Sequence, residues 1–405
     1  MKKHKALRSD FPILKELVNN YPLIYVDNAA TTQKPQYVLD AMMKFYITMN
    51  ANIHRGTHSF AERATYEYEN ARKKVAMFIG ALSEEIVFTG GCTSSINFVA
   101  ATWGDSFINQ GDEIVITELE HHANLLPWQR LVRKKGAVLK YIPVLPNGEL
   151  DMSVLDTLIT ERTKLVSVVH VSNAIGTHND VKNIIAHAKK VGAKTLIDAA
   201  QSIAHQKVDV RDLGCDFLVF SGHKVLGPTG VGVLFIDKSL HAQVEPYEVG
   251  GGMVDNVTLS EAIWSCPPHK FEAGTPPIAQ VIGLGAAVDY MNRYIDFDEL
   301  RVHEASLCSR LINGLSSIQQ IRLLGDVENL KKNGHMVSFL VDGIHSHDVA
   351  AFLDLRGISV RAGHHCAQPF ATKLGYGASV RVSFFAYNTL TEVDAIVAAI
   401  EQLVV

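Results

Sequence analysis

The stretch "FLVFSGHKVLGPTGVGVLF" (residues 217–235) places a lysine between two short apolar runs. Residues 217–220 and 231–235 are apolar enough to form buried strands of one sheet. The turn that joins them contains Ser221, Gly222, His223 and Lys224. Lysine in a turn is usually a solvated surface residue, but this turn is tight, glycine-flanked and enclosed by apolar runs. The role of Lys224 therefore depends on what the neighbouring strands bring to the same turn.

The middle of the chain alternates between apolar strand patterns and helical patterns. A helix is expected at 181–191, and buried strands are expected at 85–89, 113–117, 165–171, 195–198 and 216–220. Such alternation predicts an α/β domain in which a mostly parallel sheet lies between two layers of helices.

The pattern changes after about residue 290. Helices are expected within 306–318, at 346–357 with Gly357 as the stop, and at 391–403 with Thr391 as the cap. Strands at 336–343 and 379–385 predict a second, smaller sheet. A chain of 405 residues exceeds what one simple core supports. We therefore expect two closely packed domains, a large one at 21–292 and a smaller α+β one made of 1–20 and 293–405.

The composition excludes several classes of protein. Apolar residues make up 47% and charged residues 20%, the net charge is −4, and no long basic run indicates nucleic-acid binding. We expect no signal peptide, because no apolar stretch follows the basic N-terminus, and no membrane span. The five cysteines lack CxxC spacing, which argues against a disulfide framework or a zinc ribbon. Reduced thiols in a cytoplasmic protein explain them best.

Polar groups follow each predicted strand, where the ligands of open parallel sheets bind. They are a glycine- and hydroxyl-rich turn at 90–95, His121, Asn173, Asp198 with Gln201, and the turn with Ser221, His223 and Lys224. The first turn suits a phosphate, although neither GxxxxGK[ST] nor GxGxxG occurs. An aspartate can hold a protonated ring nitrogen, an imidazole can stack on a ring, and a lysine can form a Schiff base. Together these groups indicate pyridoxal phosphate (PLP).

Two of these residues have simpler interpretations when each is taken alone. Asp198 could cap the next helix, and His121 could be a packed loop histidine. The PLP interpretation rests on their shared position at the strand ends.

A second chemical centre is predicted in "RAGHHCAQP" (361–369). Gly363 and Pro369 bracket a turn, so Cys366 should lie on an exposed loop, and the cationic Arg361 nearby should increase its thiolate fraction. The remaining cysteines are expected to be buried and inert: Cys92, Cys215, Cys266 and Cys308. We expect no metal site, because adjacent histidines bind one ion poorly. The residues that could supply ligands to such a site are His54, His58, His364, His365 and Cys366.

Seven motifs together strongly resemble the cysteine desulfurases, which belong to the class V aminotransferase branch of the fold-type I PLP enzymes. The RxGHHC form, with Arg381 a short stretch later, is similar to group II, the SufS and CsdA type. The motifs are "LIYVDNAATTQKP" (23–35), "NIHRGTHSFAERAT" (52–65), "HHANLLPW" (121–128), "IDAAQS" (197–202), "SGHKVLGPTGVGVL" (221–234), "FEAGTPP" (271–277) and "RAGHHCAQP" (361–369).

The resemblance implies a seven-stranded sheet in the large domain and a role for each matching residue. Lys224 would hold the cofactor and move the substrate's α-proton. Asp198 would bind the pyridine nitrogen, Gln201 the phenolic oxygen, and His121 would stack on the ring. Thr93, Ser221 and His223 would bind the phosphate, with Thr275 reaching it from the other subunit of a homodimer. The substrate carboxylate would meet Asn173, which also borders the cofactor, and Arg381, with Arg361 nearby.

The implied activity converts L-cysteine into L-alanine and leaves a persulfide on Cys366. A small acceptor protein would then take the sulfur for iron–sulfur cluster assembly, and selenocysteine is a further substrate in the group. Three alternatives stay open: a selenocysteine lyase, a PLP transaminase or lyase that does not need Cys366, and a non-catalytic assembly or metal-binding subunit. Two positions depart from the family pattern, Ser94 in the phosphate loop and His178, and neither has a functional interpretation from the sequence.

Overall fold

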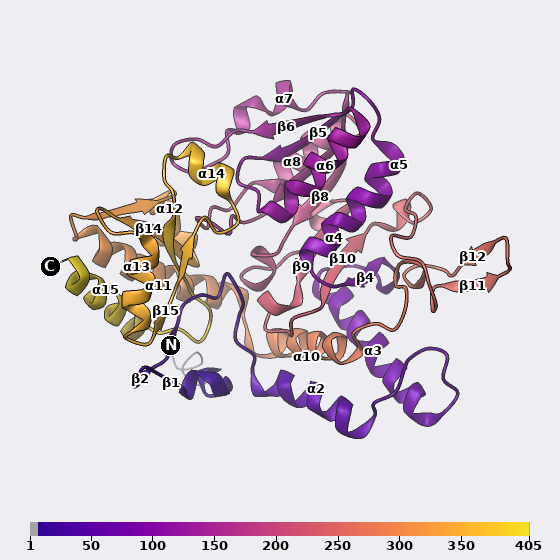
Figure 1. Cartoon of the computed structure of the whole chain (residues 1–405), viewed down its shortest axis with the longest axis horizontal. Coiled ribbons are helices and arrows are strands. Elements are labelled where there is room, and N and C mark those ends of the chain that lie inside the picture. The colour runs from indigo at the N-terminus through magenta and orange to yellow at the C-terminus, as the bar shows by residue number, and fades with distance from the viewer. Residues whose placement is uncertain (1–6, 405) are drawn as a thin grey trace.

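A computed structural model describes residues 7–404, so part of the predicted small-domain segment 1–20 lies outside the described residues. The chain is built around a seven-stranded sheet with the strand order β4-β10-β9-β8-β7-β5-β6 (Figure 1). Its strands are β4 (Ile86–Thr89), β5 (Glu113–Thr117), β6 (Val138–Ile142), β7 (Thr163–Val169), β8 (Lys194–Asp198), β9 (Phe217–Ser221) and β10 (Gly232–Ile236).

Strand β10 runs antiparallel to both of its neighbours, β4 and β9, while the pairs from β9 to β6 are all parallel. The mostly parallel sheet predicted from the sequence is therefore confirmed. Because β9 and β10 are antiparallel neighbours, with Ser221 opposite Gly232, the segment between them must turn back over the end of the sheet. That reversal places Lys224 at the carboxyl end of β9.

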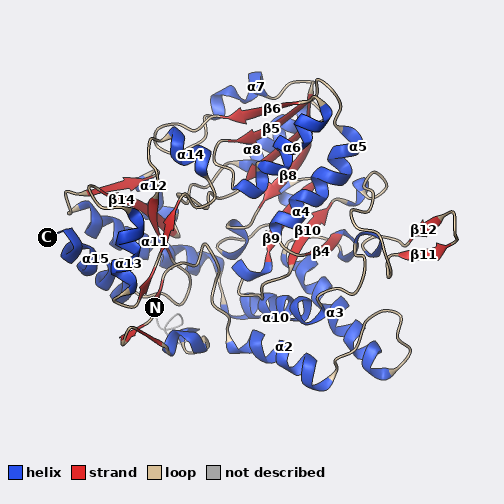
Figure 2. Ribbon diagram, in the orientation of Figure 1, coloured by secondary structure: helices blue, strands red, loops and turns tan. Residues whose placement is uncertain are grey.

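The sheet is apolar on both faces because helices cover both (Figure 2). Along β4, Ile86 and Phe88 join one core while Val87 joins another, as expected for side chains that alternate between faces. The helices of this part of the chain are α2 (Gln36–Thr48), α3 (Ser59–Phe78), α4 (Cys92–Val99), α5 (Asp105–Phe107), α6 (Leu126–Lys135), α7 (Leu155–Leu158), α8 (Val181–Lys190), α9 (Val210–Leu213) and α10 (Ile278–Tyr294).

A four-stranded sheet in the order β13-β14-β17-β16 forms the second unit, which is the smaller sheet expected from the sequence. Its strands are β13 (Ile321–Leu324), β14 (Met336–Val341), β16 (Arg361–Gly363) and β17 (Ser379–Ser383). Its helices are α11 (Phe297–Ser316), α12 (Val327–Asn333), α13 (Ser346–Asp354), α14 (Gln368–Lys373) and α15 (Leu390–Val404). Segments from the N-terminal part join this unit, since β3 (Ile24–Tyr25) pairs with β15 (Ile358–Ser359). The domain boundaries at residues 20/21 and 292/293 remain a prediction.

Two small hairpins complete the chain, β1 (Leu17–Val18) with β2 (Tyr21–Pro22), and β11 (Val254–Val257) with β12 (Ala262–Trp264). The second hairpin projects away from the rest of the molecule (Figure 1). No helix within residues 7–404 combines the length and the apolar character needed to cross a membrane.

The structure corrects two local expectations. Strand β6 was not anticipated, because the exposed side chains on it dilute the apolar signal. Thr391 does not cap the last helix, which begins at Leu390. Thr389 does so instead: its hydroxyl accepts the N–H of Glu392 at 3.3 Å, and its own N–H donates to that glutamate's carboxylate at 2.8 Å.

Candidate active site

A cavity of about 350 Å³ lies at the carboxyl ends of the large sheet's strands and is closed on one side by the smaller unit. Eleven of the twelve residues predicted from the sequence line it: Thr93, His121, Asn173, Asp198, Gln201, Ser221, His223, Lys224, Arg361, Cys366 and Arg381. Thr275 is not among the lining residues. The two nucleophiles, Lys224 and Cys366, thus face one cavity although distant parts of the chain supply them.

Lys224 ends a short 3₁₀ turn, Gly222–Lys224, that directly follows β9. The turn is held by its His223 carbonyl, which accepts from the hydroxyls of Thr31 and Thr32 at 3.0 and 3.2 Å and from the ammonium of Lys34 at 3.0 Å. Burial lowers the pKa of Lys224, and the nearby Asp198 carboxylate opposes that shift. A lowered pKa increases the fraction of the amine that is free to act as a nucleophile or base.

Asp198 ends β8 and is fully enclosed. One of its carboxylate oxygens accepts the N–H of Ala200 at 2.9 Å and the thiol of Cys92 at 3.4 Å. Burial raises the pKa of Asp198, whereas these hydrogen bonds and the charge of Lys224 lower it. A carboxylate buried in this way needs a cationic partner. A protonated ring nitrogen is a partner of that kind.

His121 caps a short turn by accepting the N–H of Ala123 at its Nδ1 atom, at 3.0 Å. Burial lowers the pKa of His121 to about 4, with smaller contributions from the charges of Lys224 and His122. The ring is therefore neutral at neutral pH, and its proton lies on Nε2 because Nδ1 accepts. A neutral, fixed imidazole suits stacking on a flat ring.

The turn at 90–95 lies against Ser221 at the end of β9 and Gly232 at the start of β10. Helix α4 begins at Cys92, whose N–H donates to the Ser221 hydroxyl at 2.9 Å, and Thr93 in its first turn lines the cavity. Gly232 is required beneath this turn, because a Cβ there would lie 2.4 Å from the Cα of Gly91. Amides and hydroxyls at a helix start form an anion site, as expected for a phosphate.

The Cys366 loop carries unusual backbone angles. His365 and Cys366 have φ angles of 54° and 56°, in the left-handed region that non-glycine residues rarely adopt. The His365 ring bonds the Ser379 hydroxyl at 2.9 Å, and its carbonyl accepts from the Asn173 amide at 2.5 Å. Cys366 is exposed, as predicted. The surrounding contacts therefore hold a costly conformation in place.

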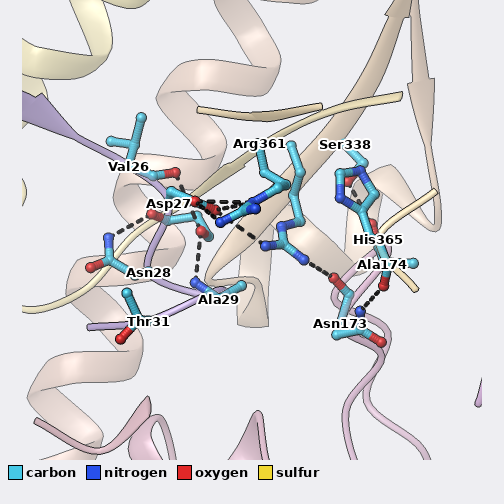
Figure 3. Close-up of polar contacts among 12 residues, drawn as sticks. Val26, Asp27, Asn28, Ala29, Thr31, Asn173, Ala174, Ser338, Arg361 and His365 are labelled. Atoms are coloured by element: carbon cyan, nitrogen blue, oxygen red, sulfur yellow. Dashed lines mark hydrogen bonds and ion pairs between the residues drawn. The ribbon is translucent and has the colours of Figure 1, made fainter. Parts of the chain in front are cut away.

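Asp27 is a candidate site residue that the sequence analysis did not identify. Its carboxylate binds Arg361 at 2.7 Å (Figure 3). The same carboxylate binds the buried Arg381 at 3.3 Å, and Arg381 also donates to the Asn173 carbonyl at 2.5 Å. Burial lowers the pKa of Arg381 to about 10, although Asp27 opposes that shift. Two arginines predicted to face one small site require a counterion, and this requirement could have indicated from the sequence that an acidic residue lies beside them.

Thr275 and Cys266 both lie outside the cavity, which the predicted role of Thr275 in the other subunit's site allows. Thr275 is exposed and accepts from the Asn52 amide at 3.3 Å, outside the cavity. Cys266 is exposed, so the expectation that it is buried was wrong, whereas Cys92, Cys215 and Cys308 are buried as expected.

One further cluster has the composition of a metal site. Within residues 7–404, ligand atoms of His54, Glu69 and His269 lie within 4.8 Å of one another. Glu69 is already bonded to His54 and to Arg72, each at 2.9 Å. The cluster does not line the cavity, and two of its members, His54 and Glu69, already bond each other.

Comparisons with known proteins agree with this geometry. The profile described as "Aminotransferase class-V" matches residues 24–396. A probable cysteine desulfurase of Halalkalibacterium halodurans is 46% identical over 393 residues, covering 97% of this chain and 96% of that protein.

Two solved structures have the same fold over the whole chain. The apo cysteine desulfurase of Thermococcus onnurineus NA1 has a TM-score of 0.95 at 44% identity, covering 100% of this chain and 98% of that one. The cysteine desulfurase CsdA of Escherichia coli has a TM-score of 0.91 at 35% identity, covering 99% and 98%.

The chain therefore belongs to the class V aminotransferases. Within that class it belongs to the cysteine desulfurases, PLP-dependent enzymes whose substrate is L-cysteine. The predicted family, fold class and cofactor are confirmed. The cavity suits PLP: Lys224 and the buried Asp198 face the same space, and Thr93 at the start of α4 lines it together with Ser221.

Proposed function

We propose that this cavity removes sulfur from L-cysteine and passes it to Cys366 as a persulfide. The observation that carries the proposal is that Lys224 and Cys366 line the same cavity. A transaminase needs the amine alone, so an exposed thiol on a strained loop facing that amine favours sulfur transfer.

Bound PLP supplies an electron sink and an aldehyde for the substrate amine. Asp198 would hold the ring nitrogen in its protonated form, and Gln201 would face the phenolic oxygen. The Gln201 amide donates to the Ala29 carbonyl at 2.8 Å, which fixes its orientation. His121 would stack on the ring. The phosphate would be bound by Thr93, Ser221 and His223.

The arginines provide the means of orienting the substrate. Arg381 lies at the cavity wall with its Nε atom unpartnered within the described residues, and Asn173 has an unpartnered Oδ1 atom nearby. A substrate carboxylate would bind the unpartnered side of the Arg381 guanidinium, with Arg361 adjacent. Fixing the carboxylate would orient the α-proton toward the Lys224 amine.

The sulfur step would use both nucleophiles in sequence. Lys224 Nζ would first take the α-proton, and its lowered pKa favours the unprotonated amine that this step requires. The Cys366 thiolate would then attack the substrate's sulfur, forming an S–S bond while the substrate's C–S bond breaks. The carbon keeps that electron pair, gains a proton and leaves as L-alanine.

A homodimer would complete the site. One face of α2 exposes an apolar stripe of Leu39, Met43, Tyr46 and Ile47, at the spacing of a single helix face. Exposed Val257, Leu259 and Ile263 lie on or between the projecting strands β11 and β12. Such surfaces fit a second copy of the chain. The exposed Thr275 would then reach the phosphate in the partner's cavity.

The persulfide needs a recipient, because a second turnover requires a free thiol. The exposure of Cys366 allows a small acceptor protein to dock beside the loop, and such an acceptor would supply sulfur for iron–sulfur cluster assembly. Free cysteines throughout the chain are consistent with a reducing compartment such as the cytoplasm.

The decisive experiment treats PLP-loaded protein with L-cysteine and follows alanine release and the mass of the Cys366 peptide. We expect the added mass of one sulfur atom on Cys366, and we expect Cys366→Ala to lose turnover. Borohydride should fix the cofactor on Lys224, and Lys224→Ala should prevent this. Unchanged alanine formation by Cys366→Ala would refute the proposal and favour a lyase that does not use the thiol.

The same assay with L-selenocysteine decides between the two related activities. A much larger kcat/KM for selenocysteine, retained in Cys366→Ala, would identify a selenocysteine lyase instead.

A further inference from the structure

His122 lies where the Cys366 loop meets the large sheet, next in sequence to the ring-stacking His121. Its backbone N–H donates to the Cys366 carbonyl at 2.7 Å, and its Nε2 atom accepts the Gln368 N–H at 3.2 Å. His122 thus forms hydrogen bonds with the backbone at Cys366 and, two residues later, at Gln368. The backbone contact does not depend on the side chain, whereas the second contact does.

The second contact fixes the start of α14. Gln368 is the first residue of this helix, so its N–H has no acceptor within the helix itself. At the other end of α14, Lys373 forms an ion pair with Glu118, which follows β5. The segment that carries Cys366 is therefore attached to the large unit at both ends of α14, and the side chain of His122 makes the attachment nearer the thiol.

The nucleophile depends on attachments of this kind. Cys366 and its neighbour His365 have positive φ angles, and no glycine relieves the cost at either position. Without external contacts the loop would relax toward ordinary angles, and the thiol would move relative to the cavity.

We propose that the His122 imidazole is a positioning residue for sulfur transfer, which holds the Cys366 thiol over the substrate through its bond to the Gln368 amide. This inference rests on the proposed function, because it assigns a role within the same reaction. His122 does not line the cavity, so we assign it a role through the Cys366 loop and none at the cofactor. Its effect should fall on the step that uses Cys366 and should spare the step that uses Lys224.

The test compares His122→Ala, His122→Gln and the control Arg130→Ala in PLP-loaded protein. Glutamine places an acceptor oxygen as many bonds from Cα as Nε2 is in histidine. Arg130 is an exposed residue on the following helix, α6. Exchange of the α-proton of L-alanine in D₂O, followed by NMR, reports on Lys224 without Cys366. Single-turnover mass spectrometry of the Cys366 peptide reports on sulfur transfer, and hydrogen exchange of peptide 364–373 reports on the loop.

In His122→Ala we expect persulfide formation to slow by about three- to tenfold, the size expected for one lost hydrogen bond of ordinary strength. Amide exchange in 364–373 should accelerate, and α-proton exchange should stay within about twofold of wild type. His122→Gln should restore most of the persulfide rate, and Arg130→Ala should match wild type in every assay.

Persulfide formation at the wild-type rate in His122→Ala would overturn the inference, as would an equal loss in both chemical steps or no recovery in His122→Gln. If the wild-type protein formed no persulfide at all, the proposed function itself would fail. That result is distinguishable because it does not depend on residue 122.

Discussion

Replacing Asp27 by asparagine removes the carboxylate that pairs with both Arg361 and Arg381. The side chain of Arg361 is 50% exposed, so solvent screens its pair with Asp27 and the loss there is below about 1 kcal/mol. The side chain of Arg381 is only 3% exposed, and removing the partner of a buried charge costs about 3–5 kcal/mol. Asparagine keeps a neutral acceptor, so we expect a loss of about 3 kcal/mol in the free energy of unfolding, nearly all of it from Arg381.

Urea unfolding of PLP-saturated protein, at one chain concentration for all variants, measures this loss. Arg361→Gln is the matched control and should lose less than about 1 kcal/mol. The double variant Asp27→Asn, Arg381→Gln should recover part of the loss, because it leaves no buried charge unpaired. The reasoning is wrong if Asp27→Asn is no less stable than Arg361→Gln. It is also wrong if the losses of stability measured for Asp27→Asn and Arg381→Gln separately simply add in the double variant.

Three further predictions concern the cavity and its surroundings. Gly232→Ala would place a Cβ 2.4 Å from the Cα of Gly91, so the turn at 90–95 must shift. We expect the affinity for PLP, titrated on apoprotein, to fall more than about tenfold (about 1.4 kcal/mol), and an unchanged affinity would contradict the close approach. Cys92→Ala removes the thiol that donates to Asp198 at 3.4 Å and should weaken PLP binding by about three- to tenfold. Cys92→Ser keeps a donor, so its PLP affinity should stay near that of wild type, and equal affinity of the two variants would exclude a role for the donor. Burial, and to a smaller extent the nearby His205, lowers the pKa of His178 to about 4. Between pH 6.5 and 4 the unfolded chain therefore binds a proton that the folded chain does not, so the stability of the protein falls as the pH falls. His178→Leu should make the free energy of unfolding less pH-dependent by up to about 1.4 kcal/mol per pH unit, and an unaltered slope between pH 7 and 5 would refute this.

Much of the architecture follows from local patterns. The apolar runs of β5, β8 and β9 are continuous because both of their faces are buried, so the strands and their parallel arrangement could be predicted. Strand β6, at the edge of the sheet, has exposed side chains and no such signal. The turn residues could also be predicted, since a parallel sheet brings the carboxyl ends of its strands to one edge.

The sequence by itself predicted most strands of the large sheet, the residues proposed to bind the cofactor and the exposed thiol, because a pattern within a short segment marks each of them. Only the tertiary structure decided how the two units meet. Asp27 between two arginines and His122 beneath the Cys366 loop are contacts between segments far apart in sequence. Periodicity and spacing describe the faces of a single segment, but they do not specify which distant side chain will neutralise a charge or accept an amide N–H. Those pairings arise only when the folded chain brings the surfaces of the two units together.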